Sequence, residues 1–174
     1  MGDQERFERL YRDHAGTVKA YALRRVGSVA AADEVVSDVF LVVWRRLRAV
    51  PDDPLPWLLG VARNAVANRQ RGVRRATALR ARILELGGSD VADGPDPGNA
   101  LESDAPVIRA LARLPERDRE LLMLVAWEGL APAQLARVLG IPRGTVNVRL
   151  HRARRRLATA LASGQLQQLT EATK

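Results

Sequence analysis

Residues 134–157 read Gln-Leu-Ala-Arg-Val-Leu-Gly-Ile-Pro-Arg-Gly-Thr-Val-Asn-Val-Arg-Leu-His-Arg-Ala-Arg-Arg-Arg-Leu, and this stretch predicts two helices joined by a tight turn. Gly140 can adopt the left-handed conformation that ends the first helix. Pro142 suits the first turn of the next helix, where its missing N–H leaves no hydrogen bond unmade. The spacing of Gly140 and Val146 is typical of a helix-turn-helix unit.

The second of these helices has two unlike faces. At about 100° per residue, one apolar stripe holds Val146, Leu150, Ala153 and Leu157. The opposite side carries amide, imidazole and guanidinium groups in the set Asn147, Val148, His151, Arg152 and Arg155. A helix held by one stripe, with such groups opposite, is shaped to enter the major groove of DNA.

A solvated face is the alternative interpretation of these arginines. However, residues 149–156 contain five arginines and no acidic residue, so the helix itself offers them no ion-pair partner. Ala136 is also small enough for the two helices to cross closely. The pattern therefore favours DNA binding.

Composition and charge bound the class of protein. The chain has 174 residues, enough for one large domain or two small ones, and 47% of them are hydrophobic. Residues 1–75 carry 14 basic and 9 acidic side chains, residues 76–108 carry 2 and 6, and residues 109–174 carry 12 and 5. Two basic lobes around an acidic connector indicate a polyanion that is contacted at two places.

The residue types exclude several kinds of site. The chain has no cysteine, which removes disulfides, zinc–thiolate sites and thiol redox sensing. It has two histidines, His14 and His151, which argues against a histidine metal cluster, and we expect His14 to be packed or half-exposed. No apolar run approaches the roughly 20 residues that span a bilayer. We therefore expect a cytoplasmic protein without membrane insertion, metal or cofactor.

Helical periodicity predicts three helices in the N-terminal part, over residues 4–26, 29–48 and 57–75, with Ser28 capping the second. The prolines of residues 48–56 predict a stiff loop. The expected buried residues are Phe7, Leu10, Tyr11, Val18, Tyr21, Ala32, Val36, Val39, Phe40, Val43, Leu47, Leu58, Val61, Ala62 and Ala65.

Two of these helices carry an outer face that the pattern leaves open. The face of the second helix holds Glu34, Asp38, Leu41, Val42 and Arg45. This face is either a slightly apolar exposed surface or a docking surface for another protein. In the second case, its charges would set how the partner is aligned on the helix.

The third helix places four residues on one face, namely Asn64, Asn68, Arg71 and Arg75, and residues 55–75 contain no acidic residue. Asn can read a base edge while Arg holds phosphates, so nucleic-acid binding is one interpretation and a solvated basic helix is the other.

The second half of the chain is predicted to be a linker followed by more helices. Residues 77–86 can extend the third helix, whereas residues 87–99 are turn-rich and acidic, which predicts a flexible linker. Helices over 106–113 and 116–128 precede the helix-turn-helix, and the tail after Gly164 is expected to fray. The predicted divisions are an N-terminal domain over 1–76, a linker over 77–104, a helix-turn-helix domain over 105–163 and a tail over 164–174.

Three segments are more specific than these patterns. They are Ala32-Asp-Glu-Val-Val-Ser-Asp-Val-Phe-Leu-Val-Val-Trp44, Pro56-Trp-Leu-Leu-Gly-Val-Ala-Arg-Asn64, and Leu114-Pro-Glu-Arg117 with Gly140-Ile-Pro-Arg-Gly-Thr-Val146 and His151-Arg-Ala-Arg154. The first resembles the polymerase-docking helix, the second the −10-reading helix and the third the −35-reading domain of a bacterial RNA polymerase sigma factor of the extracytoplasmic-function (ECF) class. The likeness covers nearly the whole chain apart from linker and tail.

The resemblance implies roles for individual residues. The helix that packs on the clamp of the polymerase's largest subunit would use Glu34, Asp38, Leu41, Val42, Trp44 and Arg45. The melted −10 strand would meet Trp57, Asn64, Asn68, Arg71 and Arg75. The −35 element would face Asn147, Val148 and His151, with Arg149 and Arg152 near phosphates and Arg143 and Arg155 on the same surface. The implied partners are core RNA polymerase, at its clamp and flap, promoter DNA, and an anti-sigma factor or other regulator.

Three features depart from the family pattern. Ser37 stands where Gln is common, and residues 48–56 lack the usual aromatic or glycine pattern of the loop that captures a flipped −10 base. Asn147 and Val148 replace a common basic residue and a common Ser. The promoter sequence therefore cannot be borrowed from relatives.

The expected fold is all-α, with an N-terminal helical bundle and a C-terminal helix-turn-helix domain joined by a flexible linker. The expected function is promoter recognition and strand opening as a subunit of RNA polymerase. The alternative is a helix-turn-helix regulator that binds duplex DNA without polymerase. We do not expect an enzyme, because the chain has no phosphate-cradling glycine loop, no nucleophile with a plausible histidine and no clustered carboxylates.

Overall fold

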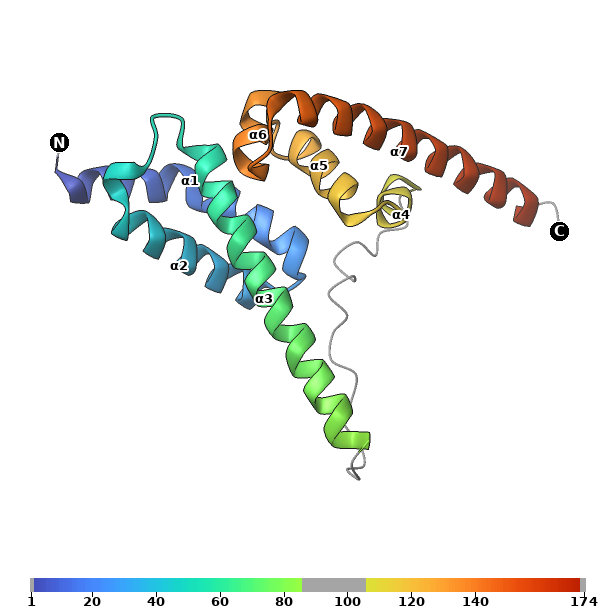
Figure 1. Cartoon of the computed structure of the whole chain (residues 1–174), viewed down its shortest axis with the longest axis horizontal. Coiled ribbons are helices and arrows are strands. Elements are labelled where there is room, and N and C mark those ends of the chain that lie inside the picture. Colours follow the sequence, from blue (N-terminus) through green and yellow to red (C-terminus); the bar gives the residue numbers. More distant parts are fainter. Residues whose placement is uncertain (1, 86–105, 173–174) are drawn as a thin grey trace. The chain divides into compact units, whose positions relative to one another are not determined.

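A computed structural model of the chain describes residues 2–85 and 106–172. This described part contains helices and turns and no strand, which confirms the all-α fold class. The chain divides into two compact units, Met1–Ala100 and Leu101–Lys174. Helices α1 to α3 belong to the first unit, and α4 to α7 belong to the second (Figure 1).

The first unit is a bundle of α1 (Asp3–Val26), α2 (Val29–Arg45) and α3 (Pro54–Glu85), each of which contacts the other two. Ser28 Oγ accepts a hydrogen bond from the Ala31 N–H at 3.4 Å and caps α2, as predicted. The core between the helices consists of small and branched side chains around Tyr21 and Phe40. Its members are Val18, Tyr21, Ala22, Ala32, Val35, Val36, Val39, Phe40, Val43, Leu58, Leu59, Ala62 and Val66.

The connection between α2 and α3 differs from the predicted one. Helix α2 ends at Arg45, and a short 3-10 turn, η1 (Leu47–Ala49), follows it and buries Leu47. Helix α3 begins at Pro54, so the first turn of this helix includes two of the prolines that were expected to form a loop. Proline is tolerated there because the first turn needs no N–H donor.

This connection is held against α1 by one side chain. The Arg6 guanidinium donates a hydrogen bond to the Val50 carbonyl oxygen at 2.7 Å, and Val50 itself is buried. The segment between α2 and α3 is therefore anchored at its centre rather than free along its length.

Helix α3 is longer than the N-terminal domain predicted from the sequence. It continues to Glu85, so residues 77–85 of the predicted linker are helical, and the rest of that linker lies outside the described residues. Residues 71–78 are all exposed, and Figure 1 shows this end of α3 extending beyond α1 and α2. We call residues 71–78 the α3 overhang.

The second unit is organised around α7 (Arg143–Ala172), which contacts α4 (Pro106–Ala112), α5 (Glu116–Ala126) and α6 (Pro132–Leu139). Its core contains Val146, Leu150 and Ala153 of the predicted inner stripe of α7, whereas Leu157, the fourth residue of that stripe, is half-buried. The buried residues are Ala110, Leu111, Leu114, Leu121, Leu122, Met123, Leu124, Leu130, Leu135, Val138, Val146, Leu150 and Ala153.

The prediction that the tail frays after Gly164 is wrong, because α7 runs on to Ala172. Residues 165–172 contain no proline and consist mostly of Gln, Leu, Glu and Ala, which are good helix formers. A single glycine inside a helix costs only about 1 kcal/mol, which is too little to end α7 at Gly164.

The turn between α6 and α7 depends on Gly140, whose φ is 63°. We expect Gly140→Ala to lower the free energy of unfolding of the second unit by about 1–2 kcal/mol, because residues with a Cβ disfavour this conformation. Urea unfolding followed by circular dichroism measures the loss. Gly144→Ala is the matched control, since Gly144 is helical and an added Cβ would meet no atom within 4 Å. Similar losses in both variants would contradict this explanation.

Candidate nucleic-acid and polymerase interfaces

The exposed side of α7 is the strongest candidate site in the second unit. Val146 and Ala153 are fully buried, whereas the side chain of Val148 is 51% exposed on the opposite side of the helix. The exposed residues around Val148 form what we call the reading face, Val148, His151, Arg152 and Arg155. The predicted division of this helix into a buried stripe and a polar face is confirmed.

Two other predicted DNA contacts lie at the margins of the reading face. Asn147 is exposed but borders a groove of about 340 Å³ toward α5 and α6, lined also by Val125, Leu130, Pro132, Leu150, His151 and Arg154. Arg149 is half-buried on the other side of the helix. Val148 therefore stands closer to the centre of the exposed surface than either of these residues. Arg143, also predicted, is exposed at the start of α7.

One arginine of α7 has an acidic partner that the sequence pattern did not reveal. The Arg156 guanidinium forms an ion pair with the carboxylate of Asp118, in the first turn of α5. Asp118 is the one charged residue that is buried within the described ranges. The pair joins α7 to α5, and it occupies an arginine that would otherwise add to the cationic surface.

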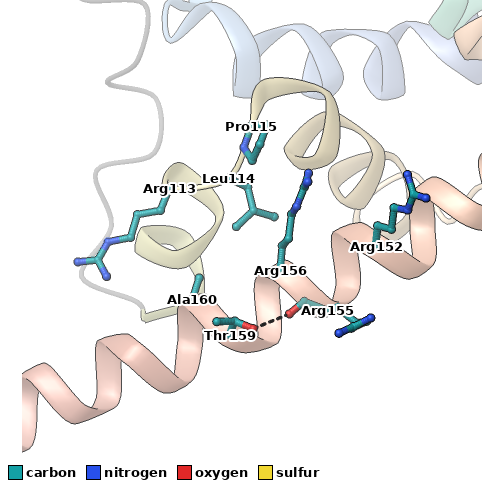
Figure 2. A pocket seen from close by; sticks show the side chains of 8 residues that line it. All are labelled: Arg113, Leu114, Pro115, Arg152, Arg155, Arg156, Thr159 and Ala160. Atoms are coloured by element: carbon teal, nitrogen blue, oxygen red, sulfur yellow. Dashed lines mark hydrogen bonds between the residues drawn. The ribbon is translucent and has the colours of Figure 1, made fainter.

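Beside the reading face lies a pocket of about 480 Å³ between α7 and the α4–α5 corner (Figure 2). We call it the arginine notch. The corner contributes Arg113, Leu114 and Pro115, and α7 contributes Arg152, Arg155, Arg156, Thr159 and Ala160. In Figure 2 the side chains of Arg113 and Arg155 extend on opposite sides of the notch.

In the first unit, the predicted −10 residues form one stripe along α3. At about 100° per residue, their positions fall within roughly 60° of one another. We call this set the α3 stripe; it comprises Trp57, Asn64, Asn68, Arg71 and Arg75. Trp57 is half-buried and the other four are exposed.

Hydrogen bonds connect neighbours along the α3 stripe. The Arg71 guanidinium donates to Asn68 Oδ1, and Arg75 Nε donates to the Arg71 carbonyl oxygen at 3.3 Å. Oδ1 of Asn68 already accepts one hydrogen bond, whereas its exposed NH₂ group can still donate to a ligand. The stripe therefore presents hydrogen-bond donors, which suits base acceptors and phosphates.

The outer side of α2 carries a second stripe. Glu34, Asp38, Leu41 and Arg45 lie within about 60° of one another, and all four are exposed; we call them the docking stripe. Val42, also predicted for docking, is half-buried. Glu34 forms an ion pair with Arg69 of α3, so one acid of the docking stripe is already attached to the helix that carries the α3 stripe.

Trp44 lies on the side of α2 that faces α1. Its ring meets Phe7 edge-on, with the ring centroids 5.2 Å apart, yet 56% of Trp44 is exposed. Tyr11 packs on Phe40 with centroids 4.7 Å apart and is 47% exposed, so the prediction that Tyr11 is buried is wrong. One side of each ring is packed and the other faces solvent, because both lie at the edge of the α1–α2 pair.

Two family models match these units. The model described as Sigma-70 region 2 matches residues 10–76, and that described as Sigma-70, region 4 matches residues 105–157. The ECF RNA polymerase sigma factor SigL of Mycobacterium tuberculosis is 34% identical over 155 residues, which cover 87% of this chain and 86% of SigL. This chain is an ECF sigma factor.

Other relatives of this ECF sigma factor agree with the assignment. The ECF RNA polymerase sigma factor BldN of Streptomyces coelicolor is 32% identical over 166 residues, covering 92% of this chain and 62% of BldN. The structure of CnrH in complex with the cytosolic domain of CnrY matches with a TM-score of 0.62 and 27% identity, over 93% of this chain and 91% of CnrH. The sigma factor RpoE from Bartonella quintana matches with a TM-score of 0.61 and 22% identity, over 90% of this chain and 96% of RpoE. At this level of identity, the match shows the shared fold alone.

Membership of this family settles the class of function. The ECF sigma factor acts in transcription initiation as an RNA polymerase sigma factor, and its region 4 contains the DNA-binding helix-turn-helix. The alternative of a regulator that works without polymerase is not favoured. Across residues 2–85 and 106–172, no helix is both long enough and apolar enough to traverse a lipid bilayer.

Proposed function

We propose that this ECF sigma factor binds core RNA polymerase through the docking stripe and Trp44, holds the melted −10 strand on the α3 stripe, and reads the −35 element with α7. The observation that carries the proposal is the two-sided character of α7. Its apolar stripe is buried in the second unit, while its reading face offers imidazole and guanidinium groups to the solvent. The chain contributes recognition and strand holding, with no catalytic step of its own, and acts in the cytoplasm.

The residue divisions follow from these roles. An N-terminal domain over residues 1–76 serves docking and −10 melting, residues 77–104 form a connector that includes the end of α3, and residues 105–163 read the −35 element. The proposed contacts to the polymerase are with the clamp of its largest subunit and with its flap. The amphipathic composition of the docking stripe supports this, because Leu41 supplies apolar area while its charged neighbours set orientation.

An anti-sigma factor is the proposed regulator. The relative CnrH has been solved in complex with the cytosolic domain of CnrY, and CnrH is 27% identical to this chain. The exposed rings of Tyr11 and Trp44 and the exposed side chain of Leu41 give such a partner apolar area to cover.

Run-off transcription tests the proposed function as a whole. Purified protein and core RNA polymerase from the same organism would be incubated with genomic fragments, and the transcripts would be mapped. We expect initiation at a small set of start sites that share −35 and −10 sequences, and weak, salt-sensitive DNA binding by the protein alone. Tight, sequence-specific footprints without polymerase, together with no selective initiation, would overturn the proposal.

The reading face predicts two different kinds of defect. His151→Ala and Asn147→Ala should cost roughly 1–3 kcal/mol on the preferred −35 sequence and little on a scrambled one, because a base contact is lost. Arg152→Ala should weaken binding to both sequences and lower the slope of log K against log salt concentration by about 0.9, because a phosphate contact is lost. Holoenzyme binding to paired −35 variants at several salt concentrations separates these outcomes. A uniform loss in His151→Ala would show that His151 does not face a base.

The α3 stripe predicts a defect in promoter melting. Unstacking a base costs a few kcal/mol, and the protein recovers this only by holding the unpaired strand. Asn64→Ala and Asn68→Ala should therefore slow formation of the open complex on duplex promoters and have a smaller effect on a pre-melted bubble. Fluorescence of a base analogue in the −10 region follows the opening rate. Equal defects on the two templates would place these residues on duplex DNA instead.

A further inference from the structure

Val148 is the apolar member of a surface that is otherwise polar. Its side chain is 51% exposed, and the other residues of the reading face are His151, Arg152 and Arg155. At about 100° per residue, Val148 lies nearly opposite the buried stripe of α7. It therefore adds nothing to the core of the second unit, and its effect falls on whatever the reading face binds.

Gly144 leaves an open space beside Val148. The two residues are one helical turn apart and fall within about 40° of each other around α7. Side chains of a helix lean toward its N-terminus, so the side chain of Val148 covers the turn that contains Gly144. Gly144 is exposed, and a Cβ added there would meet no atom within 4 Å. A flat base edge can therefore approach the methyl groups of Val148 without meeting a side chain at position 144.

A valine side chain distinguishes bases by their apolar groups, because it neither donates nor accepts hydrogen bonds. In the major groove, adenine, guanine and cytosine present polar groups, whereas thymine also presents the methyl group at C5. Valine against a polar edge would remove water from a donor or acceptor without replacing the hydrogen bond, which costs free energy. Valine against the methyl group buries apolar surface on both partners. Val148 therefore favours thymine.

We propose that Val148 selects a thymine in the −35 element by packing against its 5-methyl group, with the edge of the base over Gly144. The inference deepens the proposed function and rests on it. The proposed function assigns the surface that reads the element, whereas this inference names one base and the chemical group by which it is recognised. The polar side chains of the reading face are then left for neighbouring base pairs and phosphates.

Deoxyuridine tests the methyl contact, because it pairs as thymine does and lacks only the 5-methyl group. Promoters found by run-off transcription would carry one deoxyuridine at a time in place of each thymine of the −35 element, on both strands. Binding of the holoenzyme to each promoter would then be measured. At one position, the wild-type protein should lose affinity about fourfold, the factor for one buried methyl group. Val148→Ala lacks both γ-methyl groups and should show almost no loss there.

Two further variants sharpen this test. Val107 of α4 is 48% exposed and lies outside the reading face, so Val107→Ala should respond to deoxyuridine as the wild-type protein does. Gly144→Leu fills the space beside Val148 and should remove the response to deoxyuridine. Its fold should be retained, because leucine is a better helix former than glycine, and urea unfolding verifies this. A wild-type response in Gly144→Leu would contradict the placement of the base over Gly144.

Failure of this inference is distinguishable from failure of the proposed function. A loss of equal size in Val148→Ala and the wild-type protein would mean that another residue or the shape of the DNA senses the methyl group, which overturns the assignment to Val148. A −35 element without an A·T pair, or one in which no deoxyuridine lowers affinity, would also overturn it. In each of these cases, selective initiation by the wild-type holoenzyme would still support the proposed function. If the wild-type protein directs no selective initiation, the proposed function is wrong and the inference fails with it.

Discussion

Leu41→Glu is expected to weaken binding of the protein to core RNA polymerase by more than 100-fold. Leu41 is 53% exposed in the free protein and is the apolar member of the docking stripe. A carboxylate at this position would be desolvated in the complex without a partner, and an uncompensated buried charge costs about 3–5 kcal/mol. Each 1.4 kcal/mol corresponds to a factor of ten in affinity. Titration of labelled protein with core polymerase measures the change in Kd.

The same substitution should hardly change the fold, because exposed positions alter stability by within about 0.5 kcal/mol. Val29→Glu provides the control, since Val29 is 57% exposed on the same helix but lies outside the docking stripe. We expect Val29→Glu to bind polymerase normally. Loss of the fold in Leu41→Glu, with Kd unchanged in the folded fraction, would show that Leu41 is structural and that the docking stripe is misplaced.

A second large effect is expected from truncating a core side chain of the second unit. Leu135 of α6 is fully buried, so Leu135→Ala should lower the free energy of unfolding of that unit by about 2–5 kcal/mol. Hydrogen exchange read by mass spectrometry would show faster exchange throughout α5, α6 and the first half of α7. Discrimination between −35 sequences should fall, while binding to core polymerase through the first unit is retained.

Leu58→Ala is the matched variant in the other unit, because Leu58 of α3 is also fully buried. Its effects should be the converse, with faster exchange in α1 to α3 and weaker polymerase binding. If both variants accelerated exchange in both units equally, the two units would unfold as one, and the division of labour proposed for them would lose its structural basis.

The features predicted correctly from the sequence are those encoded over short distances. The buried stripe of α7 follows from the spacing of Val146, Leu150 and Ala153, and the end of α6 follows from Gly140. The same periodicity placed the residues of the α3 stripe on one face. Local sequence determines these features because a helix sets the direction of every side chain once its start and end are known.

The features that the sequence pattern does not predict depend on contacts between segments that are far apart in the sequence. Asp118 and Arg156 are 38 residues apart, and Glu34 and Arg69 are 35 apart, so periodicity within one helix carries no information about either pair. The arginine notch was missed for the same reason, because Arg113 meets α7 only in the folded unit. The spacing of Tyr11 matches the buried stripe of α1 and therefore predicts that Tyr11 is buried. Spacing within α1 does not show where the neighbouring helix ends, and Tyr11 lies at that edge.

The predicted helix boundaries are wrong where two local effects oppose each other. Prolines favoured a loop up to residue 56, yet α3 begins at Pro54 because its first turn needs no donor. Gly164 and the polar residues after it favoured fraying, yet α7 continues to Ala172. In both cases the helix extends past the proline or glycine that was expected to end it.

The α3 overhang has a thermodynamic consequence for promoter opening. Residues 71–78 are exposed on all sides, so their helix is maintained by its own backbone bonds and not by packing. Arg71, Arg74 and Arg75 repel one another at helical spacing, and Gly72 further lowers helix propensity. Phosphates that neutralise these arginines therefore shift the helix–coil equilibrium of this segment toward helix. Under the proposed function, in which α3 holds the separated strand, part of the free energy gained on binding that strand is spent on ordering the protein. The apparent affinity then depends on how much helix exists before binding.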